Sequence, residues 1–257
     1  MIIQNFPDNE LKSYIDEIWY VDLDSKNLND IVMPTGQVHL VFNLGDKYTI
    51  FIDNQEIEVP DFALFSQYNR AIKIKYKSHI QQLGIALKPF AFLMFFGIEF
   101  SLNDKFIIDC KSINNNELMT NLIKEVLSIK NFEQKEFFKN IENLFIRNIN
   151  KNVEINFLED MINYIEKNNG EITVKELAIK FNSSISKVER IFKKSFNITP
   201  KAYFNIIKFR KSMELKDPLS FYYDQSHFIK FCKKYTMKTP ENLINANELS
   251  LKYMLKK

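Results

Sequence analysis

The segment FNSSISKVERIFKKSFNITPKAY, residues 181–203, decides the fold of the C-terminal half of the chain. A second segment, YYDQSHFIKFCKKYTMKTPENL, residues 222–243, repeats its pattern. A duplicated structural unit explains this agreement better than a coincidence of composition. At a shift of 40 positions the coinciding pairs are Ser186 with Ser226, Lys193 with Lys233, Lys194 with Lys234, Thr199 with Thr239, and Pro200 with Pro240.

The first unit is predicted to contain two short helices joined by a tight turn. Thr173 can cap the first helix, and Glu176 supplies the second half of a capping box. The chain then turns at Asn182, one of the few residue types besides glycine that tolerate a left-handed backbone. Ser184 caps the next helix. Two helices joined in this way form a helix-turn-helix.

The second helix of this unit has the side chains of a DNA-recognition helix. Val188, Ile191 and Phe192 are predicted to face the core, which leaves polar and cationic side chains on the remaining surface. Arg can bond two atoms of guanine in the major groove, Ser and Glu can bond other base edges, and Lys suits phosphates. An ordinary solvated helix would look similar if it stood alone. The candidate DNA-binding residues here are Ser184, Ser186, Lys187, Glu189, Arg190, Lys193 and Lys194.

The charge of the chain is divided unequally between its two halves. Residues 1–173 carry 17 Lys and Arg against 25 Asp and Glu, a net charge of −8, whereas residues 174–257 carry 18 against 7, a net charge of +11. Lysines present only for solubility would be spread along the chain. The asymmetry therefore indicates a basic module for a polyanion attached to an acidic module with another role.

The N-terminal part has the alternation of β-strands. In AIKIKYK, residues 71–77, apolar residues occupy every second position, as expected of a strand with one buried face. NLGDK, residues 43–47, suits a hairpin between two strands. Several short strands from about residue 13 to 90 favour a small antiparallel barrel or sandwich.

Helical periodicity replaces this alternation after about residue 113. One apolar stripe contains Leu118, Leu122 and Val126, and a second runs from Phe137 to Ile149. These stripes predict a pair of helices that serve either as core packing or as a dimer surface. From residue 154 onward the pattern is helical throughout.

Two parts of the sequence resemble AraC-type transcription regulators. LAIKFNSSISKVERIFKKSFNITPKAYFNIIKFRKS, from residue 177, resembles the first helix-turn-helix of that family, and YYDQSHFIKFCKKYTMKTP, from residue 222, resembles the second. The resemblance spans roughly residues 155–243. It implies that Ser186, Lys187, Glu189 and Arg190 face DNA from the first recognition helix, and that Gln225, Ser226, His227 and Lys230 do so from the second.

The N-terminal segments IVMPTGQVHLVFNLGD and LGIALKPFAFLMFFGI are similar to the barrel-type sensor domain of one branch of the family. This similarity implies a cupin-like barrel that binds a small-molecule effector or holds a homodimer. RNA polymerase is a further partner that the resemblance implies.

The chain departs from the family in its second unit. Only MELKDPLSFYY, residues 213–223, separates the linking helix from the second recognition helix, with Pro218 in the middle and Phe221 where a turn glycine is expected. This leaves no room for a two-turn scaffold helix. We therefore expect an incomplete second unit. Its recognition helix either docks on the first unit through Phe228 and Phe231 or is misoriented, in which case sequence recognition rests on the first unit and on dimerisation.

Other kinds of site are not indicated by the sequence. Cys110 and Cys232 form no CxxC motif and are predicted to be buried thiols. Asp224 and His227 share a helical face but have no third ligand nearby, and His39 lacks the clustered histidines of a metal-binding barrel. Phosphate loops and nucleophile elbows are not found in the sequence. We expect no catalytic, cofactor or metal site.

The sequence thus predicts an α+β multidomain protein, with an N-terminal antiparallel cupin-like β-barrel, a helical connector and a C-terminal all-α double helix-turn-helix. The predicted domains are residues 1–112, 113–153 and 154–257. The predicted function is sequence-specific binding of double-stranded DNA by a cytoplasmic, non-enzymatic transcription regulator without a membrane span. Two alternatives remain open: a degenerate DNA-binding or protein-interaction module, and a small-molecule-binding barrel with accessory helices.

Overall fold

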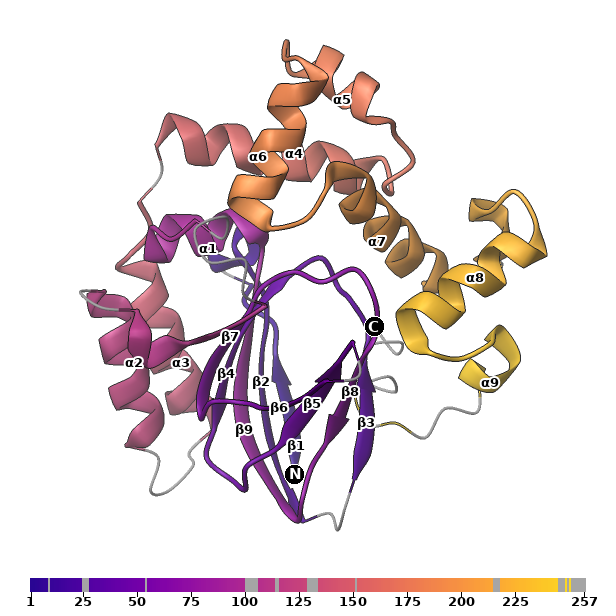
Figure 1. The fold of residues 1–257 in the computed structure, drawn as a ribbon. Helices are drawn as coiled ribbons and strands as arrows, with labels where there is room; N and C mark the ends of the chain where they lie inside the picture. The colour runs from indigo at the N-terminus through magenta and orange to yellow at the C-terminus, as the bar shows by residue number, and fades with distance from the viewer. Residues whose placement is uncertain are drawn as a thin grey trace.

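The protein folds as two facing β-sheets with helices above them and on both sides (Figure 1). The structure, a computed structural model, describes residues 1–8, 10–24, 28–53, 55–99, 106–113, 116–128, 134–150, 152–214, 218–244, 248 and 250.

The larger sheet is antiparallel and has the strand order β1-β2-β9-β4-β7-β10. Its centre is the long pairing of β2 with β9, in which Trp19 lies opposite Gly84. The strands are β1 (Ile2–Asn5), β2 (Ile15–Asp24), β9 (His79–Leu87), β4 (Val38–Asn43), β7 (Phe62–Phe65) and β10 (Ile107–Asp109).

The smaller sheet is also antiparallel, with the order β3-β8-β5-β6. The predicted alternation of residues 71–77 is confirmed, because Ile72 and Ile74 on β8 are buried whereas Lys73 and Lys75 are exposed. The strands are β3 (Asn29–Val32), β8 (Ile72–Lys75), β5 (Thr49–Ile52) and β6 (Gln55–Glu58).

The hairpin predicted at residues 43–47 is wrong. β4 pairs with β7 and β9, whereas β5 pairs with β6 and β8, so the turn carries the chain from the larger sheet to the smaller one. Asn43 holds this crossover by donating from Nδ2 to the carbonyl oxygens of Gly45 and Asp46, at 3.3 and 3.0 Å. The short Gly/Asp turn therefore carries the chain from one sheet to the other and does not form a hairpin within one sheet.

Alternation along the strands separates two apolar cores. On β7, Phe62 and Leu64 belong to the core on the outer face of the larger sheet, whereas Ala63 between them belongs to the second core. The second core lies between the sheets and includes Ile50 and Ile74 of the smaller sheet. Because successive side chains on a strand point to opposite faces, one strand serves both cores.

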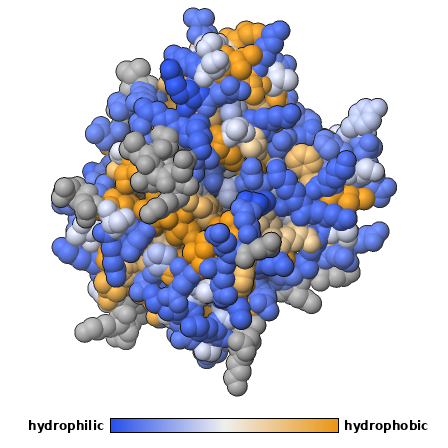
Figure 2. Space-filling model, in the orientation of Figure 1, coloured by the Kyte–Doolittle hydropathy of each residue, from blue (hydrophilic) through white to orange (hydrophobic). Residues whose placement is uncertain are grey.

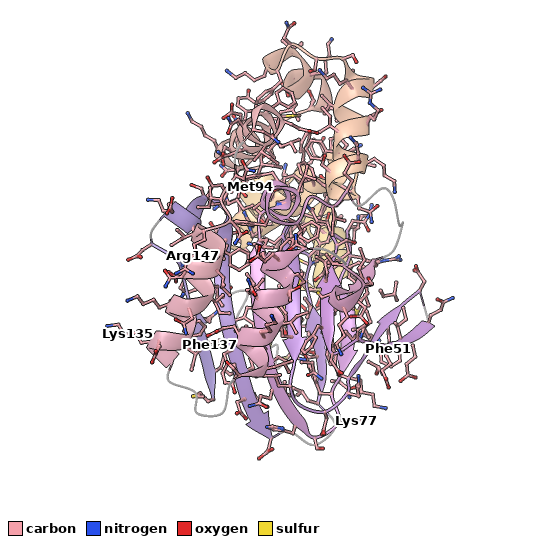
Figure 3. All side chains as sticks on the ribbon, turned by 90° about the vertical axis from the view of Figure 1, so that its left-hand side faces the viewer. Phe51, Lys77, Met94, Lys135, Phe137 and Arg147 are labelled. Carbon is pink, nitrogen blue, oxygen red and sulfur yellow. The ribbon has the colours of Figure 1, made fainter. Side chains whose placement is uncertain are left out.

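The predicted pair of helices is confirmed as α2 (Glu117–Leu127) and α3 (Gln134–Ile146). Both cover the outer face of the larger sheet, as Figure 3 shows from the side on which Lys135, Phe137 and Arg147 are labelled. Leu118, Leu122 and Phe145 are fully buried or nearly so. Their apolar stripes form core in this chain.

The most apolar segment forms a short interior helix, α1 (Pro89–Phe96). It packs against α2, α4 and α6, and the rings of Phe95 and Phe145 lie 4.8 Å apart. Among the described residues no helix is both long and apolar enough to cross a membrane.

The C-terminal part is helical, as predicted, with the first helix-turn-helix formed by α5 and α6. The capping box of Thr173 with Glu176 is present, and Asn182 has the expected positive φ of 46°. The α-helices are α4 (Val153–Lys167), α5 (Val174–Lys180), α6 (Ile185–Phe196), α7 (Pro200–Met213), α8 (Gln225–Thr236) and α9 (Pro240–Ile244).

The second unit lacks a full scaffold helix in its described part. The chain between α7 and α8 forms a single short 3-10 turn, η4 (Pro218–Phe221). Residues 215–217, which belong to the same connection, lie outside the described residues. As a whole, the strands and helices confirm the antiparallel β domain and the C-terminal helical domain that the sequence predicts.

Candidate nucleic-acid interface and ligand cavity

Helix α6 is held as a rigid element by its caps and its buried face. The Ser184 hydroxyl accepts a hydrogen bond from the Lys187 backbone N–H at 3.2 Å, which caps the N-terminus. Val188, Phe192 and Phe196 are fully buried. A left-handed residue, Asn197 with φ 55°, ends the helix.

The candidate DNA-binding side chains of this unit lie on the exposed face of α6. Ser186, Lys187, Glu189, Arg190 and Lys193 are all exposed, as are Ser184 and Lys194. In Figure 2 hydrophilic residues cover much of the upper helices on the visible face, and apolar residues gather nearer the centre, where the helices meet the sheets.

Some of these side chains already have partners. Lys194 forms an ion pair with Glu99 at 2.7 Å, which links α6 to the segment after α1. Lys193 donates to the side chain of Asn197 at 3.2 Å, and the Lys187 ammonium lies 5.9 Å from the centre of the Phe157 ring.

Helix α8 repeats the design of α6. Each helix has 12 residues, begins at a side-chain cap and ends at a left-handed residue, Asn197 after α6 and Met237 after α8. After each helix comes a Thr-Pro pair that begins the next one, at Thr199 and Thr239. The duplication in the sequence is therefore also a duplication of structure.

The candidate residues of α8, namely Gln225, Ser226, His227 and Lys230, are exposed like their counterparts. Asp224 does not combine with His227 into a metal site. Its carboxylate accepts a hydrogen bond from the His227 backbone N–H at 2.7 Å and caps the helix. Within the described residues, no cluster of three or more His, Cys, Asp or Glu side chains could hold a metal ion.

Aromatic packing joins α8 to α7 and η4. The ring of Tyr222 lies 5.1 Å from Phe228 and 5.4 Å from Phe231, and Tyr235 lies 5.1 Å from Phe209 of α7. Phe228 and Phe231 therefore pack on Tyr222, directly after η4, whereas the ring contact with α7 is made by Tyr235. Docking of Phe228 and Phe231 on the first unit stays a prediction.

Helix α8 also contacts the β domain. The Ala71 backbone N–H donates to the carbonyl oxygen of Lys234 at 2.9 Å. Further along the chain, Ser250 donates to the buried carboxylate of Asp30 on β3, from its N–H at 3.1 Å and from its hydroxyl at 2.6 Å. These contacts tie the second unit to the smaller sheet.

A cavity of about 400 Å³ lies between the two sheets. Its walls are mainly apolar and aromatic, and residues of α4 and α7 line one end. Trp19 lies flat against Gly84, where a Cβ would come within 2.0 Å of the indole ring. Only a glycine at this position leaves room for the indole in the cavity wall.

Partly buried charges connect the end of the cavity to α7. The Arg210 guanidinium donates to the carbonyl oxygen of Thr35 at 2.9 Å and lies 3.4 Å from the carboxylate of Glu166. Lys88 binds the other oxygen of Glu166 at 3.0 Å. Burial raises the pKa of Glu166, but the two cations outweigh it and hold the pKa below its ordinary value.

Neither the cavity nor the role of Arg210 is predicted from the sequence. A signal for Arg210 existed, because it continues the apolar stripe of Tyr203, Ile206 and Ile207 at helical spacing, and those three residues are buried. A charge on such a stripe requires a buried partner. The partner, Glu166 on another helix, could not be identified from spacing.

The remaining titratable candidates are inert. Cys110 and Cys232 are free and buried, as predicted. Burial raises the pKa of both thiols, that of Cys232 to about 12. Burial also lowers the pKa of His39 to about 4, so its imidazole, 3.0 Å from the Thr35 hydroxyl, is neutral at physiological pH.

Solved structures of ToxT from Vibrio cholerae share this fold at low sequence identity. An apo variant is 11% identical with a TM-score of 0.51, and the match covers 89% of this chain and 97% of that chain. Wild-type ToxT with a bound unsaturated fatty acid is 10% identical with a TM-score of 0.51, covering 88% and 93%. These similarities show the fold.

Three further comparisons do not extend the similarity beyond the fold. The AraC-like transcriptional activator CuxR matches with a TM-score of only 0.30 and 8% identity, over 75% of this chain and 80% of that chain. Residues 4–107 match the family described as a domain of unknown function, DUF6597. No match was found among the curated proteins.

Proposed function

We propose that this protein is a sequence-specific DNA-binding transcription regulator of the AraC type, in which α6 enters the major groove. The observation that carries the proposal is the duplicated pair of capped helices, α6 and α8, with exposed polar and cationic faces in the half of the chain that has a net charge of +11. Such a pair suits two successive major-groove faces of one duplex.

The side chains of α6 divide into base-contacting and backbone-contacting groups. Arg190 is assigned to a guanine edge, because its guanidinium can donate two parallel hydrogen bonds. Ser186 and Glu189 are assigned to neighbouring base edges. Lys187 and Lys193 are assigned to phosphates. Ser184 and Lys194 contribute less, because the first caps the helix and the second is paired with Glu99.

The second unit contributes through the exposed face of α8, where Gln225, Ser226, His227 and Lys230 lie. Its contacts with the β domain support a weaker role in DNA binding than that of α6, since docking on Ala71 limits how freely α8 can adjust to the groove.

The β domain is proposed to bind a small-molecule effector in the cavity between the sheets. Support comes from the cavity itself and from the ToxT structure in which an unsaturated fatty acid is bound. Arg210 links the end of this cavity to α7, the helix between the two recognition helices, so an effector could alter the placement of α8.

The remaining assignments follow from the same proposal. Residues 1–112 would form the sensor domain, 113–153 the connector and 154–257 the DNA-binding domain. RNA polymerase and a second copy of the chain are proposed partners, the location is cytoplasmic, and the protein catalyses no reaction.

In vitro selection of random duplex DNA by the full-length protein tests the proposal. We expect enrichment of a motif that Arg190→Ala abolishes, with a loss of about 1–3 kcal/mol of binding free energy on the selected site. The length of the motif shows whether one or both recognition helices contribute.

Lys193→Ala serves as the matched control on the same helix. It is expected to weaken binding to selected and scrambled DNA alike, and to reduce the slope of log K against log salt by about 1. Equal losses of both variants on both DNAs would refute the division of roles. Salt-sensitive binding without any enriched motif would instead favour a degenerate, non-specific module.

A further inference from the structure

The cavity between the sheets has the size and walls of a small-molecule site. Its volume of about 400 Å³ falls in the usual range for such sites. Aromatic rings form much of the wall, among them Trp19, Tyr48, Phe65, Tyr68 and Tyr76. A ligand there would lose most of its contact with water.

The cations at the end of the cavity already have anionic partners. Arg210 is engaged by Glu166 and by the carbonyl oxygen of Thr35. Lys88 is engaged by Glu166 at 3.0 Å and lies 4.0 Å from Asp16. An anionic ligand would have to displace Glu166, which would leave a carboxylate buried beside the ligand.

The carboxylates that line the cavity are engaged as well. Asp30 accepts hydrogen bonds from the Ile31 N–H and from both donors of Ser250. Asp16 accepts from the side-chain amide of Gln37. In the other two cases, Glu17 accepts from Gln4 at 2.6 Å and Glu214 from Lys211 at 2.9 Å. A cationic ligand would therefore have to compete with existing donors.

One polar group in the wall differs from all of these. The Tyr48 hydroxyl has no hydrogen-bond partner within the described part of the chain, although only 2% of the residue is exposed. Its ring is fixed by stacking on Tyr76, with 5.3 Å between the ring centres. The hydroxyl oxygen is not among the fully buried atoms without a partner and is therefore open to the cavity, where a ligand can supply the hydrogen bond that hydroxyl groups in protein interiors normally make.

We propose that the cavity takes an uncharged, largely apolar small molecule whose single polar group hydrogen-bonds to the Tyr48 hydroxyl. An alcohol, ketone or ester with an apolar body has this chemistry. A charged head group would enter an environment without a free counter-charge among the described residues, and such burial is costly. The inference rests on the proposed effector site and specifies the class of effector.

Fluorescence titration of the full chain tests the proposal, because Trp19 is the only tryptophan and lines the cavity. Three probes with a ten-carbon chain differ in the head group: 1-decanol, kept below its solubility limit, and decanoate and decyltrimethylammonium, kept below their critical micelle concentrations. We expect 1-decanol to change Trp19 emission with a dissociation constant about tenfold or more below those of the two charged probes.

Two tyrosine variants separate a specific contact from general apolar binding. Tyr48→Phe should weaken 1-decanol binding by about threefold to tenfold, the value of one hydrogen bond. Tyr235→Phe is the matched control, because Tyr235 is equally buried and its hydroxyl also lacks a partner, but it does not line the cavity. It should leave the affinity unchanged.

The outcomes are decisive in either direction. Decanoate or decyltrimethylammonium binding as tightly as 1-decanol would overturn the inference, and so would equal affinities of the wild type and Tyr48→Phe. If no probe changes the emission or the thermal midpoint, the inference fails as well. The DNA selection is a separate measurement, so loss of the proposed DNA-binding function would not be mistaken for failure of the cavity assignment.

Discussion

At the scale of single residues, the partly buried charges at the end of the cavity link the β domain to the helices. Glu166 binds both Lys88 and Arg210, and Arg210 also binds the carbonyl oxygen of Thr35. Removing Glu166 leaves Arg210 without its carboxylate and Lys88 with only the more distant Asp16, 4.0 Å away, and such a loss costs more than the intact group contributes.

Glu166→Gln is predicted to lower the free energy of unfolding by about 2 kcal/mol at pH 7, because two partly buried cations lose their carboxylate. Urea denaturation measures the change. Glu171→Gln is the control, since Glu171 forms an ion pair with Lys208 at 3.2 Å but is itself exposed. That substitution should cost less than about 1 kcal/mol. Equal costs for the two variants would contradict the role of burial.

The effect of Glu166 should also depend on pH. Its pKa in the folded protein is lowered from the ordinary value of 4.5, so the folded state favours the carboxylate. The stability from this group is therefore present above pH 4.5 and is lost as the pH falls through the folded pKa. The difference between wild type and Glu166→Gln should shrink on acidification from pH 7 to below 4.5, as measured by urea denaturation at each pH. A constant difference would show that the carboxylate is not preferentially ionised in the folded protein.

At the scale of elements, α6 and α8 have the same length and the same left-handed C-terminal conformation, but a different residue type adopts that conformation in each. Both helices end in a left-handed residue that turns the chain toward the next Thr-Pro start. Asn197 suits that conformation, whereas Met237, with φ 57°, does not. The second unit therefore carries local backbone strain that the first avoids.

Met237→Gly is predicted to raise the free energy of unfolding by about 1 kcal/mol, because glycine adopts positive φ without steric cost. The Met237 side chain is exposed, so its removal loses little packing. Asn197→Gly, the equivalent change in the first unit, should alter stability by less than about 0.5 kcal/mol. Chemical denaturation of both variants measures the difference, and a loss of stability in Met237→Gly would contradict the argument.

At the scale of the whole molecule, the β domain and the helical domain meet along α7. The turn at Gly36, with φ 80°, lies so close to α7 that a Cβ would come within 3.1 Å of Ile207 and 3.2 Å of Tyr203. Together with the Lys234 and Ser250 contacts, this packing places α8 against the smaller sheet. An effector in the cavity and DNA on α8 would therefore act on one connected structure.

Gly36→Ala is predicted to destabilise the protein by about 2 kcal/mol or more, of which about half is backbone strain and the rest the close contact with α7. Gly97→Ala is the matched control, because Gly97 has a similar φ of 66° but no atom within 4 Å of a Cβ. Gly97→Ala should lower the free energy of unfolding by about 1 kcal/mol, the cost of the backbone strain without a steric contact. Equal thermal and urea stabilities of the two variants would mean that the turn does not pack on α7 as described.

Local features of the fold could be predicted well from the sequence. The capping box at Thr173, the left-handed turn at Asn182 and the shortened connection at Pro218 depend on residues a few positions apart, so spacing and residue type were sufficient. The turn at residues 43–47 was misassigned because its composition suits a hairpin within one sheet as well as a crossing between two. Strand pairing is decided by distant residues.

The sequence by itself determined the two-part architecture, the duplicated helix-turn-helix unit and the set of candidate DNA-binding side chains, because periodicity, capping and charge are local properties of the chain. Only the tertiary structure decided which groups meet: Arg210 with Glu166, Ser250 with Asp30, and the unpartnered Tyr48 with the cavity wall. These contacts join residues far apart in the chain, and the free energy of burying a charge or a hydroxyl depends on the partner found there.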